Sequence, residues 1–255
     1  MGKKALAAVS FGTSYPQARE AISRIERALA AVRPDYQLFR AFTSGMVADR
    51  IEREEGVRIP SPAALLERIA AEGYDEVLCQ SLHVIPGFEY EKLQKAIEPY
   101  AARFKKLTLG KPLLWDTKDY LRLSRALLAH MPKLGADEAF VWMGHGTDHP
   151  ANAAYALLEN TFRFDGAERV YVATVEGFPN FDYVLRRLHR QGVSRVRLAP
   201  LMVVAGDHAQ NDLAGPEEDS WKSVLESEGY HVQCDLRGLG EYEEVAALFA
   251  AHLPA

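Results

Sequence analysis

Two loops of this chain look like copies of each other, and this repetition constrains the fold more than any other feature of the sequence. The stretch QSLHVIPGFEY (80 to 90) aligns with APLMVVAGDHA (199 to 209), which places Glu89 opposite His208. In both copies an apolar run rich in β-branched residues ends in a loop of small residues. The repetition predicts a duplicated α/β unit.

A second pair of loops supports the duplication. AVSFGTS (8 to 14) aligns with WMGHGTD (142 to 148), so that Phe11 lies opposite His145. Ser44 similarly lies opposite Glu176, because a glycine follows each of them. The paired positions lie between 119 and 134 residues apart, so equivalent elements keep their order while loop lengths drift.

Strand-like runs alternate with segments of helical period, which is the pattern of βαβ units and a parallel sheet. The expected strands are 4 to 10, 36 to 42, 76 to 84, 105 to 109, 138 to 143, 168 to 175, 194 to 204 and 231 to 236. Apolar residues at helical spacing predict helices over 17 to 32, 62 to 73 and 89 to 104, with further helices between the later strands. We therefore expect two Rossmann-like or flavodoxin-like α/β halves, residues 1–134 and 135–255, each with a parallel sheet flanked by helices.

The composition excludes several classes of protein. A net charge of -5 gives no electrostatic footprint for DNA or RNA. The two cysteines, Cys79 and Cys234, are too few for a disulfide framework, a cysteine-rich zinc site or a cysteine-ligated iron–sulfur cluster. No apolar stretch approaches the roughly 20 residues that span a bilayer, and the opening MGKKALAAVS leads straight into a strand, so we expect a cytoplasmic protein without a membrane partner.

The loops after the strands carry the candidate chemistry. Open α/β sheets bind ligands outside the carboxyl ends of their strands. If the two halves face each other, six loop positions share one cleft between them: Phe11, Ser44, Glu89, His145, Glu176 and His208. Two imidazoles and a carboxylate in the second half suit cobalt, nickel, iron or zinc and suit magnesium poorly.

Each candidate also has a simpler structural interpretation. Glu89 stands at a helix start, where a carboxylate is favourable against the helix dipole. His145 alone could be a hydrogen-bonded turn residue, and His83, in an apolar strand, is expected to be a core histidine. The joint placement of Glu89, His145, Glu176 and His208 at equivalent loops favours the functional interpretation.

Long motifs in order along the chain resemble a known family. KALAAVSFGTSY, LFRAFTSGMV, SLHVIPGFEYEK, VWMGHGT and PLMVVAGDHAQNDLAG followed by DSWK are similar to the anaerobic-type sirohydrochlorin cobaltochelatases, class II chelatases related in fold to the ferrochelatases. The resemblance implies two similar α/β domains around a tetrapyrrole cleft. It also implies metal ligands at His145 and His208, with an acidic group at Glu89 or Glu176.

The resemblance implies insertion of Co²⁺ into sirohydrochlorin, or its precorrin-2 form, with release of two protons in anaerobic cobalamin synthesis. We expect His145 and Glu89 to be catalytic and His145, Glu176 and His208 to bind the metal. The residues expected to line the substrate are Ser10, Phe11, Thr13, Ser44 and Gly87. The expected partners are the tetrapyrrole and a divalent metal ion, with no cofactor beyond that ion and no ATP, haem or iron–sulfur cluster. A homo-oligomer remains open.

Other functions remain open on the residues alone. The same ligands suit Fe²⁺ and Ni²⁺, so an iron or nickel chelatase acting on the same tetrapyrrole is an alternative. A zinc-dependent hydrolase would use the same His, His, Glu set, and a carrier would bind tetrapyrrole or metal without insertion. The basic residues that hold the substrate carboxylates are not determined among Arg40, Lys92 and Lys95, and the role of His149, shortly after the GHG motif, is also open.

Overall fold

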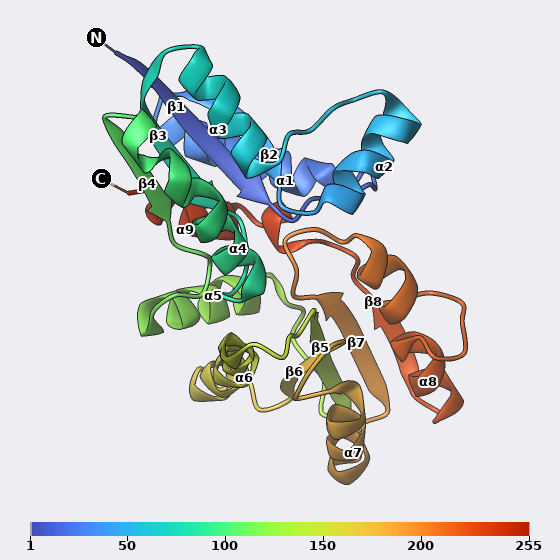
Figure 1. Ribbon diagram of the computed structural model, residues 1–255. Helices are drawn as coiled ribbons and strands as arrows, with labels where there is room; N and C mark the ends of the chain where they lie inside the picture. The colour runs from blue at the N-terminus through green and yellow to red at the C-terminus, as the bar shows by residue number, and fades with distance from the viewer. Residues whose placement is uncertain (1, 255) are drawn as a thin grey trace. The chain divides into compact units, whose positions relative to one another are not determined.

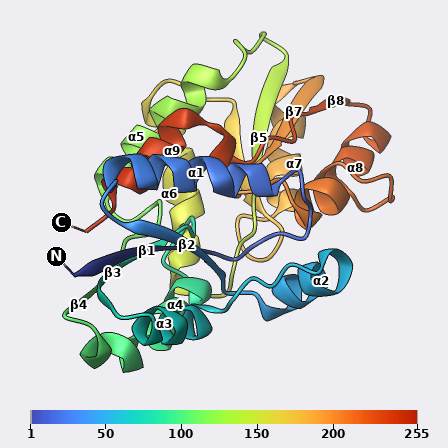
Figure 2. The same ribbon diagram turned by 90° about the horizontal axis from the view of Figure 1, so that it is seen from above.

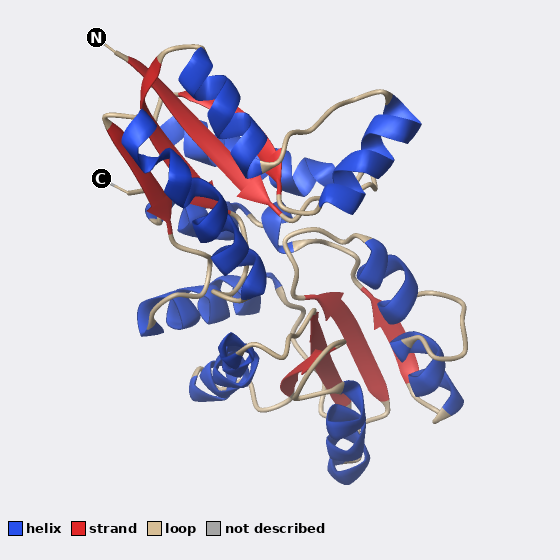
Figure 3. Ribbon diagram, in the orientation of Figure 1, coloured by secondary structure: helices blue, strands red, loops and turns tan. Residues whose placement is uncertain are grey.

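The strands of this protein form two parallel four-stranded sheets in the computed structural model, which describes residues 2–254. The chain divides into two compact units. Unit 1 contains the residues up to Trp115 and those from Gly240 onward, and unit 2 contains Asp116–Leu239. Helices flank both sheets, as Figures 1 and 3 show. The expected α/β fold class with parallel sheets is confirmed.

The sheet of unit 1 has the strand order β2-β1-β3-β4. Its strands are β1 (Lys3–Ser10), β2 (Gln37–Phe42), β3 (Tyr74–Ser81) and β4 (Lys106–Gly110). The central strand β1 is buried on both faces from Ala5 to Val9, which explains its continuous apolar run. Parallel pairing brings the carboxyl ends of all four strands to one edge of the sheet.

Helices cover both faces of this sheet. Figure 2 shows α1 (Arg19–Val32) and α9 (Glu243–Ala251) on one face and α3 (Pro62–Ala71) and α4 (Phe88–Ile97) on the other. The helix α2 (Gly45–Glu55) follows β2, and the 3₁₀ helix η1 (Glu98–Arg103) continues α4. The apolar faces of α3 and α4 pack on the strands through Leu65, Leu66, Ile69 and Leu93.

The sheet of unit 2 repeats this arrangement with the order β6-β5-β7-β8. Its strands are β5 (Glu138–Gly144), β6 (Val170–Thr174), β7 (Arg195–Pro200) and β8 (His231–Cys234). Its helices are α5 (Thr117–His130), α6 (Ala153–Phe164), α7 (Phe181–Gln191) and α8 (Trp221–Ser227), with short turns η2 (Pro150–Asn152), η3 (Ala209–Leu213) and η4 (Leu239–Glu241) around them. The identical strand order supports the duplication that the loop sequences indicated.

The terminal helices are assigned differently from the expected division at residues 134 and 135. That division separates the two sets of strands, but α5 packs against α6 in unit 2 and α9 packs against α1 in unit 1. The backbone at Gly240, just before α9, packs closely against α1. A Cβ on Gly240 would lie 2.5 Å from the carbonyl oxygen of Ala21, so a larger residue would push the two segments apart. An amphipathic pattern shows which side of a helix is buried, but it does not show which sheet buries it.

Two expected strands are too long by three or four residues at their carboxyl ends. The structure ends β3 at Ser81 and β7 at Pro200, whereas the expected strands run to residues 84 and 204. The residues beyond are apolar because they form buried loops, as Leu82 and Leu201 do, and a short apolar run does not distinguish a buried loop from a strand. Every helix within residues 2–254 is too short or too polar to cross a membrane.

Candidate functional site

The loops at the carboxyl edge of each sheet contain equivalent backbone hydrogen bonds. In unit 1 the N–H of Ser44 donates to the carbonyl of Phe11 at 3.3 Å, and in unit 2 the N–H of Glu176 donates to the carbonyl of His145 at 2.7 Å. A glycine with positive φ follows the accepting residue in each loop: Gly12, at +98°, follows Phe11, and Gly146, at +84°, follows His145. The two edges therefore have matching backbones, and their side chains can be compared position by position.

Glycine at position 146 allows His145 and Glu176 to come close. A Cβ there would lie 1.8 Å from the carbonyl oxygen of Glu176, so no other residue could occupy this turn. Gly144 is equally constrained, since its Cβ would lie 2.3 Å from the ring of Tyr155. Burial raises the pKa of Tyr155 to about 12, so its phenol stays protonated and its oxygen accepts from the N–H of Gly146 at 3.4 Å.

The structure brings the imidazoles of His145 and His208 together within unit 2. Their ring centroids lie 4.7 Å apart, edge to face at 85°. The Nδ1 of His145 is 2.9 Å from the carbonyl oxygen of Gly146, and the Nδ1 of His208 is 2.6 Å from the Oδ2 of Asp212. Because a carbonyl and a carboxylate accept, the neutral form of each ring carries its proton on Nδ1 and leaves the lone pair of Nε2 for a metal ion.

Glu176 lies beside His145 without facing its Nε2 atom. Its Oε2 is 3.9 Å from the Nδ1 of His145, and its side chain is 64 % exposed. Within the described residues 2–254, no group of three His, Cys, Asp or Glu side chains is arranged to hold a metal ion. The structure thus brings two of the three predicted ligands into one pair and leaves the third on the edge of that pair.

Glu89 lies in the first turn of α4 in unit 1, as the sequence predicted. Its Oε1 is 3.6 Å from the Nζ of Lys92, which donates to the backbone carbonyl of Thr43 at 2.6 Å. Its Oε2 is buried and has no hydrogen-bond donor among the described residues. A buried carboxylate oxygen without a donor needs an explanation, and a ligand that supplies a proton is one.

His83 is buried next to this carboxylate. Its Nδ1 is 2.9 Å from the Oγ of Ser81, and its Nε2 is 3.5 Å from the Oγ1 of Thr43. Burial lowers the pKa of His83 to about 4, against a smaller opposing effect of Glu89, so the imidazole is neutral at pH 7. It matches the core histidine that the sequence predicted. His149 accepts from the N–H of Ala151 at 3.0 Å and begins the turn η2.

Most of the residues predicted to line the substrate have buried side chains. Ser10, Thr13 and Ser44 are between 3 and 6 % exposed. The Thr13 and Ser44 hydroxyls accept from backbone N–H groups of their own loops. Phe11, by contrast, is 46 % exposed. Gly87 is also buried, and it precedes Glu89 at the N-cap of α4. The hydroxyls of Thr13 and Ser44 therefore shape the loops, the buried Oγ of Ser10 has no hydrogen-bond partner among the described residues, and Phe11 is available to a ligand.

Two exposed apolar side chains at this edge of unit 1 were missed from the sequence. Met46 is 80 % exposed at the start of α2, and Phe88 is 57 % exposed at the start of α4. The duplication carried a usable signal, because Met46 follows Ser44-Gly45 as Phe178, 64 % exposed, follows Glu176-Gly177. Large apolar side chains exposed next to candidate chemistry indicate a surface that an apolar ligand covers.

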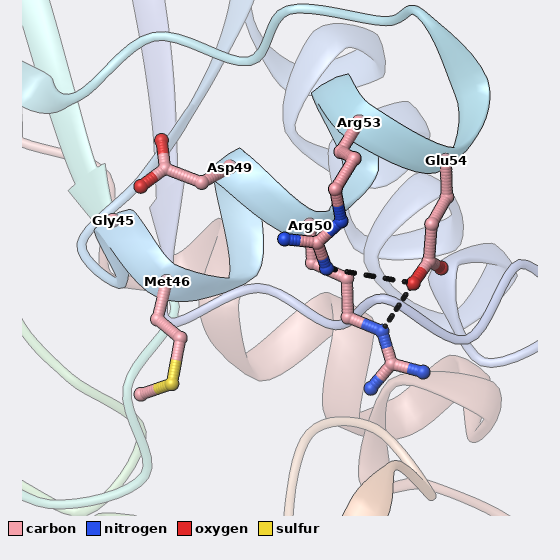
Figure 4. A pocket seen from close by; sticks show the side chains of 6 residues that line it. All are labelled: Gly45, Met46, Asp49, Arg50, Arg53 and Glu54. Atoms are coloured by element: carbon pink, nitrogen blue, oxygen red, sulfur yellow. Dashed lines mark hydrogen bonds and ion pairs between the residues drawn. The ribbon is translucent and has the colours of Figure 1, made fainter.

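A pocket of about 600 Å³ lies along α2 and is shown in Figure 4. Gly45, Met46, Asp49, Arg50, Arg53 and Glu54 line it. Glu54 pairs with Arg50 at 2.9 Å and with Arg53 at 3.7 Å. None of the predicted catalytic or metal-binding residues lines this pocket, although Met46 belongs to both the pocket and the apolar edge.

Of the three cations that the sequence left open for the substrate carboxylates, Arg40 is held by the protein itself. Its Nε and Nη2 donate to the buried carboxylate of Glu26 at 2.7 and 2.5 Å. Lys92 is bound to Thr43, and the side chain of Lys95 is 77 % exposed beside Glu91. Lys95 is thus the most accessible of the three.

Comparisons with known proteins identify the family of this chain. Residues 4–255 match the family model described as cobalt chelatase (CbiK). The chain is 46 % identical over 254 residues to a sirohydrochlorin cobaltochelatase of Salmonella typhimurium, covering 98 % of this chain and 95 % of that protein. It is 36 % identical over 259 residues to the sirohydrochlorin cobaltochelatase CbiKC of Nitratidesulfovibrio vulgaris, covering 100 % of this chain and 91 % of that protein.

Solved chelatase structures share the fold at low sequence identity. SirB from Bacillus subtilis with Fe³⁺ superposes with a TM-score of 0.65 at 15 % identity, covering 98 % of this chain and 94 % of that chain. CbiX, described as the terminal enzyme of sirohaem biosynthesis in denitrifying bacteria, superposes with a TM-score of 0.55 at 16 % identity, covering 98 % and 97 %. On the family match over almost its whole length, the chain belongs to the cobalt chelatase (CbiK) family of enzymes.

Proposed function

We propose that the chain inserts Co²⁺ into sirohydrochlorin and releases the two pyrrolic protons of the ring. The observation that carries this proposal is the pair of imidazoles in unit 2, with both Nε2 atoms free to bind a metal ion. The named activity of two relatives, 46 % and 36 % identical over nearly the full chain, supports the choice of substrate and metal. Imidazole nitrogen suits Co²⁺ as a ligand.

His145 and His208 hold the incoming ion in this proposal, and Glu176 completes the set. Insertion requires the ion to shed its waters stepwise and then to leave the protein for the ring. Two neutral imidazoles hold such an ion without neutralising its charge, so they compete weakly with the four ring nitrogens. The carboxylate of Glu176, 64 % exposed, is free to swing from the Nδ1 side of His145 toward the ion.

Glu89 takes a pyrrolic proton in this proposal. A metal-bound imidazole cannot accept a proton on the nitrogen that binds the metal, so the base has to be another group. The buried Oε2 of Glu89 has no donor within residues 2–254, and Lys92 holds the side chain at the start of α4. The Glu89 side chain as a whole is 35 % exposed, so a rotation of the carboxylate would present this oxygen to a pyrrolic N–H, a donor of the kind that it lacks.

The macrocycle lies against the apolar edge of unit 1 in this proposal. Phe11, Met46 and Phe88 supply exposed apolar surface at the carboxyl ends of β1, β2 and β3. A tetrapyrrole is flat and apolar over its ring faces, so burial of these side chains favours its binding. Ser10, Thr13, Ser44 and Gly87 then act through the loops that carry the apolar side chains, and a direct contact from any of them stays a prediction.

The reaction is proposed to need no ATP, haem or iron–sulfur cluster. Ligand exchange at the ion and proton transfer to a carboxylate are sufficient for the chemistry, and the chain supplies groups for both. We also propose a cytoplasmic reaction and leave the oligomeric state to experiment.

Anaerobic incubation with sirohydrochlorin and Co²⁺, followed by absorption spectroscopy, tests the proposal. We expect the spectrum of the free tetrapyrrole to convert to that of its cobalt complex with multiple turnovers. Parallel reactions with Fe²⁺ and Ni²⁺ measure metal preference. Tight binding without conversion would indicate a carrier, and stoichiometric zinc with turnover of an ester or phosphate would indicate a hydrolase. Either result would overturn the proposal.

A further inference from the structure

Asp212 lies one helical turn after His208 and contacts its ring directly. The Nδ1 of His208 and the Oδ2 of Asp212 are 2.6 Å apart, a short hydrogen bond to a carboxylate. The two side chains are 32 % and 44 % exposed, so neither is fully exposed to solvent. Neither the sequence motifs nor the comparisons assign a role to Asp212.

This bond selects the tautomer of His208. A carboxylate accepts and does not donate, so the proton of the neutral ring is held on Nδ1 and the lone pair is left on Nε2. His145 reaches the same state through the carbonyl of Gly146, at 2.9 Å from its Nδ1. A carboxylate behind a histidine ligand fixes the orientation of the ring and raises the basicity of the nitrogen that binds the metal.

The short π-helical segment η3 (Ala209–Leu213) supplies a rigid base for this contact. Ala209 and Leu213 are fully buried, and Leu213 packs in the core of unit 2. These two residues directly follow His208 and Asp212, so their burial anchors the segment on which the partly exposed side chains of His208 and Asp212 stand. Asn211 donates to Asp207 at 3.1 Å, which leaves the Asp212 contact to His208 undisturbed by its neighbour.

The equivalent helix of unit 1 lacks this arrangement. The alignment that pairs Glu89 with His208 pairs Asp212 with Leu93, which is fully buried. Glu89 is instead contacted by Lys92, whose positive charge would repel a metal ion bound at Glu89. A carboxylate one turn after the candidate side chain thus occurs in unit 2, behind His208, and not in unit 1, behind Glu89.

We propose that Asp212 is a positioning residue for cobalt delivery: it holds His208 as the Nδ1-protonated tautomer with Nε2 directed to the incoming Co²⁺. This inference rests on the proposed function, in which His208 is a ligand of the substrate ion. Loss of such a partner typically lowers metal affinity by about 10–100-fold.

The test compares Asp212→Ala, Asp212→Asn and His208→Ala with the wild type, and Asp207→Asn is the matched control at a neighbouring carboxylate. Co²⁺ affinity is measured by anaerobic titration without tetrapyrrole, and ¹⁵N NMR of the labelled rings reports the tautomer. We expect Asp212→Ala to bind Co²⁺ about 10–100-fold more weakly and to lose the Nδ1-protonated form of His208. Asp212→Asn should retain part of both, because its amide oxygen still accepts, and Asp207→Asn should resemble the wild type.

The outcomes separate this inference from the proposed function. If His208→Ala loses Co²⁺ affinity while Asp212→Ala keeps both the affinity and the Nδ1-protonated ring, the role of Asp212 is wrong and the ligand role of His208 stands. If His208→Ala also keeps its Co²⁺ affinity, then His208 is not a ligand and both proposals fail. Equal losses in Asp212→Ala and Asp207→Asn would reduce the effect to local charge and would also overturn the inference.

Discussion

The two sheet edges of this protein have the same backbone and different side chains. The N–H of Leu82 donates to Val9 in unit 1 as that of Leu201 donates to Met143 in unit 2, both at 2.7 Å. At equivalent positions on this backbone, unit 2 carries His145, Glu176 and His208, whereas unit 1 carries Phe11, Ser44 and Glu89. A duplicated scaffold can thus keep its loop geometry while its two copies take up different chemistry.

The difference indicates a division of work within the proposed reaction. The edge of unit 2 supplies nitrogen ligands of the kind that a transition metal ion needs. The edge of unit 1 supplies apolar surface and one carboxylate whose Oε2 is buried. Of the four changes predicted below, those at His145, Glu89 and Met46 test this division, and the change at His83 tests a second difference between the two units, the burial of a histidine in unit 1.

The largest effect is expected from His145→Ala. This change removes one of the two imidazoles, so cobalt insertion should fall below detection while the free energy of unfolding changes little, since the ring is 44 % exposed. Single-turnover insertion and Co²⁺ titration measure the effect, and Phe11→Ala is the matched change in unit 1, expected to keep Co²⁺ affinity. Near-normal insertion by His145→Ala would remove the basis for assigning the metal to unit 2.

Glu89→Gln should slow insertion by about 10²-fold or more, the usual range for a lost general base. The substitution preserves size but removes the proton acceptor, so substrate binding should change little. Glu176→Gln is the matched variant at the other edge, and single-turnover rates of both across pH identify the base. A normal rate and pH profile for Glu89→Gln, with a slow Glu176→Gln, would reverse the roles given to the two carboxylates.

Because His83 of unit 1 is buried and neutral, we expect the free energy of unfolding to depend on pH through this residue. Its pKa is lowered to about 4 in the folded protein, against 6.5 for the free group, so the unfolded chain binds this proton first as pH falls. The stability present above pH 6.5 is therefore lost between pH 6.5 and 4, by about 3 kcal/mol at most. His83→Met installs the residue that occupies the equivalent position in unit 2, Met202.

Urea unfolding at pH 7 and at pH 4.5 measures this difference. We expect the stability of His83→Met to depend less on pH than that of the wild type, and the reciprocal Met202→His to add a smaller dependence, because Met202 is only partly buried. Parallel pH profiles for the wild type and His83→Met would mean that His83 is not held neutral by burial.

The smallest effect is expected from Met46→Ser. The side chain is 80 % exposed, so its removal should leave stability within about 0.5 kcal/mol. If it covers part of the macrocycle, tetrapyrrole affinity should fall by several-fold, from about 1 kcal/mol of lost apolar burial. Fluorescence titration with sirohydrochlorin measures this, and Co²⁺ affinity without tetrapyrrole is the control. A loss of both affinities, or of neither, would contradict a macrocycle surface in unit 1.

The alternation of strands and helices was predictable because it depends on local patterns. Every expected strand is present, and the equivalence of Ser44 with Glu176 holds in the backbone hydrogen bonds. The helix α2 was not predicted, since Ile51 is its only buried residue among those described and gives no apolar period. The sequence did not predict that α5 packs in unit 2 and α9 in unit 1, because a helical pattern does not show which sheet a helix packs against.

The site was predictable in its residue types and not in its orientations. The sequence placed His145 and His208 after equivalent strands, but the atoms that face a metal depend on side-chain torsions. These are set by the Gly146 carbonyl and by Asp212, and although both residues lie within the quoted motifs, a motif does not show which atoms they contact. The exposure of Met46 and Phe88 was also hidden, because apolar residues at a helix start look like core residues in a sequence.

The packing of α9 in unit 1, after unit 2 in the chain, has a consequence for folding during synthesis. Unit 2 is one uninterrupted stretch, Asp116–Leu239, inserted between the two parts of unit 1. During synthesis from the N-terminus, the ribosome delivers the whole of unit 2 before it delivers α9, the helix that packs against α1. Domains generally fold as units in the order in which they emerge. Here unit 1 begins before unit 2 and is completed after it, so one side of α1 stays uncovered until α9 emerges.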